Sequence, residues 1–267
     1  MGSREIVVAA VAGVIIATAG GVSAAIVRGR TAAATPQPVR EAAGETPVVV
    51  ELFTSEGCSS CPAADTVLAR LAATQPIKGA HIIALSEHVD YWNQLGWRDP
   101  FSSAAYSRRQ SEYASAFRSD QVYTPQMVVD GQTEFVGSDE RAAGAAIAEA
   151  ARKSKAQVTV ALSSGNSATV RVSGLHGGVG PVDVYAAVTE SGLVSQVANG
   201  ENAGRRLTHA AVVRRLERIG TIGASGAFDG IFHFEAPPSG QDVRIVSFVQ
   251  ERNSRHIAGA GEATVAG

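Results

Sequence analysis

The chain has 267 residues, 45% of them hydrophobic, and its 23 basic and 25 acidic residues give a formal net charge of −2. This length is sufficient for one large domain or two modest ones. The near-neutral charge and the lack of a dense basic run exclude a surface that follows nucleic-acid phosphates, so we expect no nucleic-acid partner.

The N-terminal segment, residues 1–30, has the pattern of a membrane-addressing sequence. No charged residue occurs from 6 to 27. Two interpretations are open: a cleaved signal peptide, or an uncleaved inner-membrane anchor formed by residues 6–27. Both predict an extracytoplasmic protein, periplasmic or secreted, that contacts the membrane only through this segment. Residues 31–46 are rich in alanine and proline and are typical of a linker.

Residues 47–155 alternate strand-like and helix-like runs. The first three predict a βαβ unit, in which parallel strands need a right-handed crossover. An inserted helix follows an aromatic-rich stretch, and a hairpin with a tight Asp130-Gly131 turn leads to a last helix. The expected elements are a strand over 48–55, a helix over 62–73, a strand over 81–86, a helix over 102–117, strands over 126–129 and 133–136, and a helix after Ser138.

The only two cysteines, Cys58 and Cys61, lie between the first strand and the first helix. A helix N-terminus stabilises a thiolate, and Pro62 fits the first helical turn. The spacing therefore predicts a dithiol redox centre, with Cys58 as the more exposed, attacking thiol and Cys61 as the buried, resolving one. A redox-active Cys58–Cys61 disulfide needs no further cofactor, and we assign no metal ligand.

Glu51 is a carboxylate inside the apolar run Val-Val-Val-Glu-Leu-Phe. Burial would raise its pKa and let it exchange a proton with Cys61 if it lies beneath the dithiol. The alternative is a structural carboxylate that is hydrogen-bonded to backbone or to an arginine.

The order of these elements, with a CxxC after the first strand and a proline opening the third, resembles the thioredoxin fold. The resemblance implies that Pro125 follows a cis peptide bond and faces the dithiol, and that Thr124 pairs with the backbone of a bound substrate. The segments VELFTSEGCSSCP, HVDYWNQLGW, YTPQMVVDG and GENAGR are similar to a secreted bacterial family catalogued as a domain of unknown function. That similarity implies fold and export rather than activity.

Residues 156–267 change to short β-rich runs separated by Gly- and Pro-containing turns, the pattern of a small antiparallel sandwich. The polar segment 200–206 and the following His209 are interpreted as a hairpin loop that leads to a satisfied, half-buried histidine, with a ligand or partner surface as the alternative. The expected fold is thus an α/β thioredoxin-like domain followed by a small all-β antiparallel sandwich domain. The economical role for the second domain is to position or select partners.

The predicted function is an exported thiol–disulfide oxidoreductase that acts on protein thiols and disulfides together with an unidentified redox partner. One alternative is a non-enzymatic envelope interaction module whose disulfide is structural. A disulfide that closes a loop of about four residues stabilises the fold by only about 2 kcal/mol on the chain-entropy model, which argues against a purely structural disulfide. A second alternative is a Cu(I)-handling protein in which His88 joins the two thiolates. Zinc fits less well because a four-ligand spacing is absent.

Overall fold

The computed structural model describes residues 44–175, 181–223, 225–235 and 242–265. The expected signal peptide or anchor, residues 1–30, and nearly all of the expected linker lie outside these ranges. Within the described ranges, none of the helices combines the length and the apolar character that a bilayer crossing requires.

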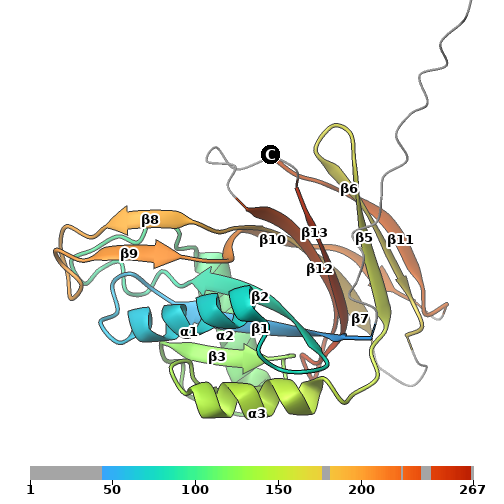
Figure 1. Ribbon diagram of the computed structural model, residues 1–267, viewed down its shortest axis with the longest axis horizontal. Coiled ribbons are helices and arrows are strands. Elements are labelled where there is room, and N and C mark those ends of the chain that lie inside the picture. The colour runs from blue at the N-terminus through green and yellow to red at the C-terminus, as the bar shows by residue number, and fades with distance from the viewer. Residues whose placement is uncertain (1–43, 176–180, 224, 236–241, 266–267) are drawn as a thin grey trace, which may run out of the picture. The chain divides into compact units, whose positions relative to one another are not determined.

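The first half of the chain forms the expected order of elements (Figure 1). Strands β1 and β2 are parallel, β3 runs antiparallel to β1, and β4 returns along β3. The Asp130-Gly131 turn joins β3 to β4, and both residues have positive φ, 49° and 66°. The bounds are β1 Thr46–Thr54, α1 Cys61–Thr74, β2 Ala80–His88, α2 Ala104–Phe117, β3 Gln126–Val129, β4 Thr133–Val136 and α3 Glu140–Ala150.

The described part of the second half contains strands only. Three of them form a separate antiparallel sheet in the order β11-β6-β5, and β8 and β9 form a two-stranded ribbon. The bounds are β5 Gln157–Ser163, β6 Ser167–Ser173, β7 Val182–Glu190, β8 Leu193–Gln196, β9 Arg206–His209, β10 Val212–Ile222, β11 Phe228–His233, β12 Val243–Glu251 and β13 Ile257–Thr264.

The remaining strands of both halves build one eight-stranded mixed sheet in the order β13-β12-β7-β10-β2-β1-β3-β4. The two halves meet where β10 lies parallel to β2, with Val212 opposite Ser86 and the Ser86 N–H donating to the Ala211 carbonyl at 2.8 Å. The expected fold class was therefore wrong. The protein is mostly β, and its central sheet is shared, so a thioredoxin-like α/β domain is not followed by an independent sandwich.

The physical reason for this sharing lies in strands that are buried on both faces. Eight of the nine residues of β7 are buried, which is typical of a central strand rather than of a sandwich strand with one wet face. One face of β7 and β12 packs on the β5-β6-β11 sheet through Val158, Val170 and Val184. The other face joins a cluster that contains Tyr106 of α2.

The helices divide between the two faces of the large sheet because side chains of a strand alternate. Val48, Val50 and Leu52 of β1 pack against α1 and α3. Val49 and Phe53 of the same strand point the other way and pack with Tyr106 and Tyr113 of α2. This division decides which β1 side chains can reach the cysteines at the start of α1.

Candidate functional site

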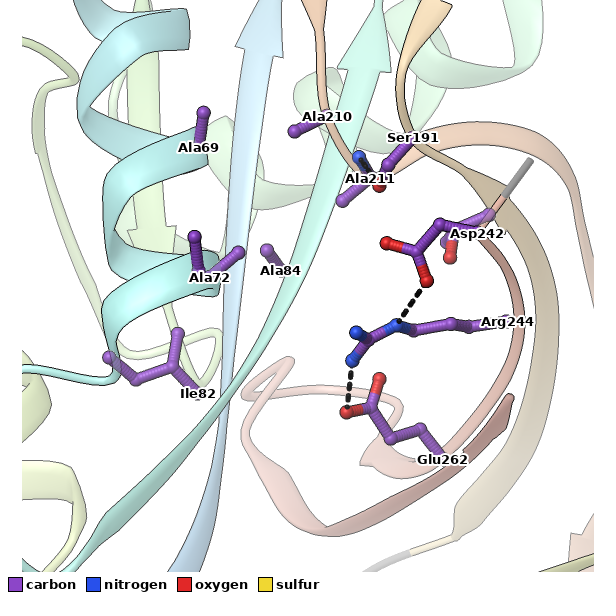
Figure 2. A pocket seen from close by; sticks show the side chains of 12 residues that line it. Ala69, Ala72, Ile82, Ala84, Ser191, Ala210, Ala211, Asp242, Arg244 and Glu262 are labelled. Carbon is purple, nitrogen blue, oxygen red and sulfur yellow. Dashed lines mark hydrogen bonds and ion pairs between the residues drawn. The ribbon is translucent and has the colours of Figure 1, made fainter.

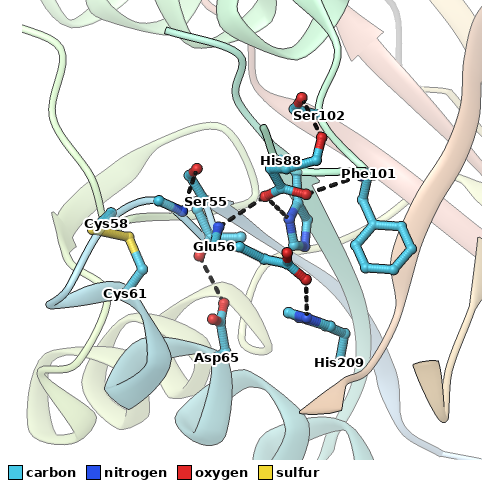
Figure 3. Close-up of polar contacts among 12 residues, drawn as sticks. Ser55, Glu56, Cys58, Cys61, Asp65, His88, Phe101, Ser102 and His209 are labelled. Atoms are coloured by element: carbon cyan, nitrogen blue, oxygen red, sulfur yellow. Dashed lines mark hydrogen bonds and ion pairs between the residues drawn. A yellow bond between two sulfur atoms is a disulfide. The ribbon is translucent and has the colours of Figure 1, made fainter. Parts of the chain in front are cut away.

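Cys58 and Cys61 form a disulfide where the loop after β1 enters α1, with their Cα atoms 5.4 Å apart (Figure 3). Cys61 is the first residue of the helix, Pro62 follows it in the first turn, and the N-cap Ser60 makes no side-chain capping bond. The disulfide therefore lies at the N-terminus of the helix, as the sequence predicted. Both residues are buried: Cys58 is 1% exposed and Cys61 0%. Cys58 was expected to be the more exposed of the two, but the difference between them is only one percentage point.

Thr124 and Pro125 lie beside the disulfide. The peptide bond between them is cis, as the family resemblance implied. The Thr124 carbonyl oxygen is 3.9 Å from the sulfur of Cys58, and the Ser60 hydroxyl oxygen is 3.4 Å from the same sulfur. The structure thus brings together four of the five residues that the sequence assigned to the site: Cys58, Cys61, Thr124 and Pro125.

Glu51, the fifth residue, is not beneath the dithiol. Its side chain leaves β1 on the α2 face, where Oε1 accepts a hydrogen bond from Arg109 Nε at 2.6 Å and Oε2 accepts one from the Tyr113 hydroxyl. Arg109 also lies 3.3 Å from a carboxylate oxygen of Glu87. Glu51 is therefore a structural carboxylate bound to an arginine, and the proton-exchange role expected for it is not supported by its position.

Asp65 is the acid on the dithiol side of the sheet, and the sequence interpretation missed it. It lies four residues after Cys61 on α1, so the two share a helix face. Its Oδ1 accepts a hydrogen bond from the Thr54 hydroxyl at 2.8 Å. Burial raises the pKa of the Asp65 carboxyl, and His88 and the Thr54 hydrogen bond offset only part of this rise. The spacing Cys61, Ala64, Asp65, Leu68 on one apolar face was the signal that could have identified it.

Two buried histidine–carboxylate pairs adjoin Asp65 (Figure 3). His88 Nδ1 is 2.7 Å from Asp99 Oδ2, and His209 Nε2 is 2.8 Å from Glu56 Oε1. The two imidazole rings meet edge to face, with centroids 5.1 Å apart. Burial opposes the charged form of His88, but the charge and hydrogen bond of Asp99 outweigh it and raise the His88 pKa. His88 is therefore bound to Asp99 rather than available as a free loop histidine.

These pairs also hold the loop that carries Cys58. The Glu56 N–H donates to Asp99 Oδ2 at 2.8 Å, and Trp97 Nε1 donates to Glu56 Oε2 at 2.7 Å. Because His209 is on β9, the second half of the chain contributes directly to the surroundings of the dithiol. His209 was interpreted from the sequence as a half-buried histidine after a hairpin loop. The structure places it on the strand that follows this loop, and its contact with Glu56 was not predicted.

The loop between β8 and β9 binds the backbone of the same region. Asn202 is 1% exposed, and its Nδ2 donates to the carbonyl oxygens of Glu56 at 2.8 Å and Cys58 at 2.9 Å. Glu201 Oε2 accepts the backbone N–H of Ser59 at 2.9 Å. Hydrogen bonds from the Ser59 hydroxyl and N–H lower the pKa of Glu201. The polar segment 200–206 is the expected hairpin loop, since it joins the antiparallel strands β8 and β9, and it is also part of the site.

A cavity of 270 Å³ lies away from the cysteines, between α1, β2 and the ends of β12 and β13 (Figure 2). Its charged side chains pair with one another: Arg244 binds Asp242 at 3.3 Å and Glu262 at 2.9 Å. Glu262 also lies 3.0 Å from His81 Nε2 and raises the pKa of that histidine. Within the described ranges, no group of three or more His, Cys, Asp or Glu side chains has an arrangement that could hold a metal ion.

Comparisons with known proteins show which family and which solved structures the chain is similar to. The family model described as "Protein of unknown function (DUF1223)" matches residues 49–250. Curated proteins give no significant match. Among solved structures, the crystal structure of a protein from Agrobacterium tumefaciens is similar to this chain, with a TM-score of 0.63. The two sequences are 26% identical, and the match covers 86% of this chain and 96% of that one.

Two further solved structures resemble only part of the chain. An endonuclease/exonuclease/phosphatase from Beutenbergia cavernae is 14% identical, with a TM-score of 0.23 over 42% of this chain and 24% of that one. A superoxide reductase from Archaeoglobus fulgidus is 12% identical, with a TM-score of 0.21 over 43% of this chain and 91% of that one. Both TM-scores are too low to indicate a shared fold.

Proposed function

The chain belongs to the DUF1223 family of proteins of unknown function, and we propose that it is an exported thiol–disulfide oxidoreductase that acts on protein thiols and disulfides through Cys58 and Cys61. One observation carries the proposal: the two sulfurs form a disulfide at the start of α1, beside the Thr124 carbonyl. A thiolate formed there has the helix dipole and unpaired N–H groups to stabilise it.

In the reduced protein, the Cys58 thiolate attacks a substrate disulfide. An S–S bond forms between Cys58 and one substrate sulfur, and the other substrate sulfur leaves as a thiolate. The Cys61 thiolate then attacks Cys58, re-forms the Cys58–Cys61 bond and releases the second substrate sulfur, so the substrate gains the two electrons that the dithiol loses. The reverse sequence oxidises a substrate dithiol.

Cys61 must lose a proton before it can attack, and Asp65 is the group suited to accept it. Asp65 lies one helical turn from Cys61. Its raised pKa brings the proton affinity of the carboxylate closer to that of a thiolate. Its hydrogen bond from Thr54 fixes the carboxyl in place. Asp65 thus takes the role that the sequence interpretation gave to Glu51.

The N-terminal apolar segment supports export of the protein. The disulfide is consistent with this, because disulfides persist in oxidising compartments outside the cytoplasm. An exported dithiol that turns over also needs a redox protein to return it to its starting state. The membrane role of residues 6–27 is confined to delivering or anchoring the protein.

A structural disulfide in a non-enzymatic interaction module is the second candidate function. The 1% exposure of Cys58 favours it, because a buried sulfur is protected from exchange. The copper alternative depended on His88 as a third ligand. Among the described residues, His88 does not form a group of three metal-ligating side chains with Cys58 and Cys61, so no observation favours that alternative.

Substitution of the resolving cysteine separates the two candidates. An oxidoreductase with Cys61→Ala, expressed as the full chain in a bacterial host that exports it, is expected to accumulate mixed disulfides between Cys58 and other proteins. These adducts appear on non-reducing gels and disappear with dithiothreitol. The Cys58→Ala variant is the matched control and should give no such adducts. If Cys61→Ala gives none either, the disulfide is structural.

A further inference from the structure

One segment of the second half, the β8–β9 loop, residues 197–205, lies against the backbone on both sides of Cys58. Three hydrogen bonds join it to the backbone that carries Cys58: two from Asn202 to the carbonyls of Glu56 and Cys58, and one from the Ser59 N–H to Glu201. Arg205 Nη1 donates to Asn202 Oδ1 at 2.8 Å and holds the amide in the required orientation. Asn202 is therefore anchored on both sides.

The loop also rests on the aromatic segment before α2. A Cβ added at Gly200 would lie 3.1 Å from the Cβ of Trp97, and one added at Gly96 would lie 3.5 Å from the backbone of Gly200. Gly200 has φ of +77°, a conformation that glycine adopts without strain. The two glycines allow the covering loop and the aromatic segment to approach closely beside the disulfide.

The covering loop can move without breaking the main sheet. Strands β8 and β9 form a ribbon of their own. Within the loop only Val197 and Asn202 are buried, while the other residues are exposed. A segment that buries so little apolar surface has a low free energy of local opening.

We propose that the β8–β9 loop is a displaceable cover of the disulfide, and that Glu201 and Asn202 are the residues that determine access to Cys58. This inference rests on the proposed function, since it explains how a cysteine that is 1% exposed takes part in exchange. In the covered state the disulfide is shielded. When the loop is displaced, the carbonyls of Glu56 and Cys58 lose the Asn202 amide and the sulfur of Cys58 is uncovered.

The chemistry that the cover controls is disulfide exchange with an external dithiol. Its thiolate attacks the uncovered Cys58 sulfur, an S–S bond forms between them, and Cys61 leaves as a thiolate that takes up a proton. The second thiol of the reductant then displaces Cys58 and becomes oxidised. The protein gains two electrons and the dithiol loses two.

The test measures how fast excess dithiothreitol reduces the oxidised full-length protein, by quenching with a maleimide and weighing the labelled chain. Asn202→Ala removes both hydrogen bonds to the carbonyls of Glu56 and Cys58 and is expected to accelerate reduction about tenfold. Glu201→Ala, which removes the acceptor of the Ser59 N–H, is expected to accelerate it about threefold. Asn199→Ala is the matched control, because Asn199 is an exposed residue of the same type in the same loop. It should react at the wild-type rate.

Reoxidation distinguishes a cover from an effect on the redox pair itself. Loss of a cover accelerates reduction and reoxidation by diamide together, whereas a change in disulfide stability accelerates one and slows the other. If Asn202→Ala does not fold, Glu201→Ala decides the question, because that side chain is exposed. The proposal that the loop covers the disulfide would be overturned if both variants were reduced and reoxidised at wild-type rates. It would also be overturned if reduction became faster while reoxidation became slower. This readout needs no protein substrate, so it is independent of the trapping experiment on Cys61→Ala.

Discussion

The side-chain amide of Asn202 donates to the backbone carbonyl of Cys58 at 2.9 Å, across a sequence separation of 144 residues. The residues that hold and cover the disulfide therefore come from both halves of the chain. A site built in this way requires the whole described fold, which is why a single shared sheet matters for function.

Asp65→Asn is expected to slow the step in which Cys61 attacks the mixed disulfide, on the order of 100-fold, because the amide cannot accept the thiol proton. The measurement is the pH profile of Cys58–Cys61 re-formation from a glutathione mixed disulfide, in which the variant should lose the acidic inflection due to Asp65. Asp120→Asn, at an exposed position, is the control. An unchanged profile in Asp65→Asn would remove Asp65 from the mechanism.

Glu87 gives the folded state a pH-dependent stability. Burial raises its pKa well above the usual 4.5, and the neighbouring Glu51 adds to this rise although Arg109 opposes it. The folded state thus keeps a proton that the unfolded state releases above pH 4.5. The free energy of unfolding should therefore fall as pH rises from 4.5 toward the folded pKa, by about 1.4 kcal/mol per pH unit at most.

Glu87→Gln removes this dependence and should flatten the stability profile in urea unfolding experiments over that pH range. Glu149→Gln, at a largely exposed position, should retain the wild-type slope. A slope that survives in Glu87→Gln would assign the titration to another group.

Arg109 links the two halves of the molecule. It binds Glu51 of β1 at 2.6 Å and Gln250 of β12 at 3.1 Å. Arg109→Leu leaves the buried Glu51 carboxylate without its cation and should lower the free energy of unfolding by about 3–5 kcal/mol. Arg108→Leu, the exposed neighbour on the same helix, should stay within about 0.5 kcal/mol. Equal losses in both variants in chemical denaturation would contradict a specific role for Arg109.

Gly131 fixes the turn between β3 and β4. Its φ is +66°, and an added Cβ would lie 1.9 Å from the carbonyl oxygen of Arg255. Gly131→Ala should therefore lower the free energy of unfolding by about 3 kcal/mol or more. The alanine would adopt a strained positive φ, and the backbone around Arg255 would also have to shift to make room for the Cβ. Gly165 has a similar φ of +79° with open space around it. Gly165→Ala should cost only about 1 kcal/mol, the conformational strain alone.

Local sequence patterns predicted most of the first half correctly. The apolar run before the cysteines and Pro62 after them indicated a disulfide at a helix start, and Asp130-Gly131 indicated the hairpin turn; both are present. Such features depend on neighbours in sequence, since helix starts and tight turns are fixed by a few consecutive residues. The export segment remains a prediction from composition.

The sequence by itself determined the dithiol, its place before α1 and the alternation of side chains along β1. Tertiary structure decided which helix covers which face of that strand, and so placed Glu51 with Arg109 and left Asp65 on the side of the cysteines. It also decided that β10 pairs with the free edge of β2 and that the Asn202 amide binds the Cys58 carbonyl. These choices are non-local: any open strand edge can accept a partner, and only competition among all the strands selects which one binds.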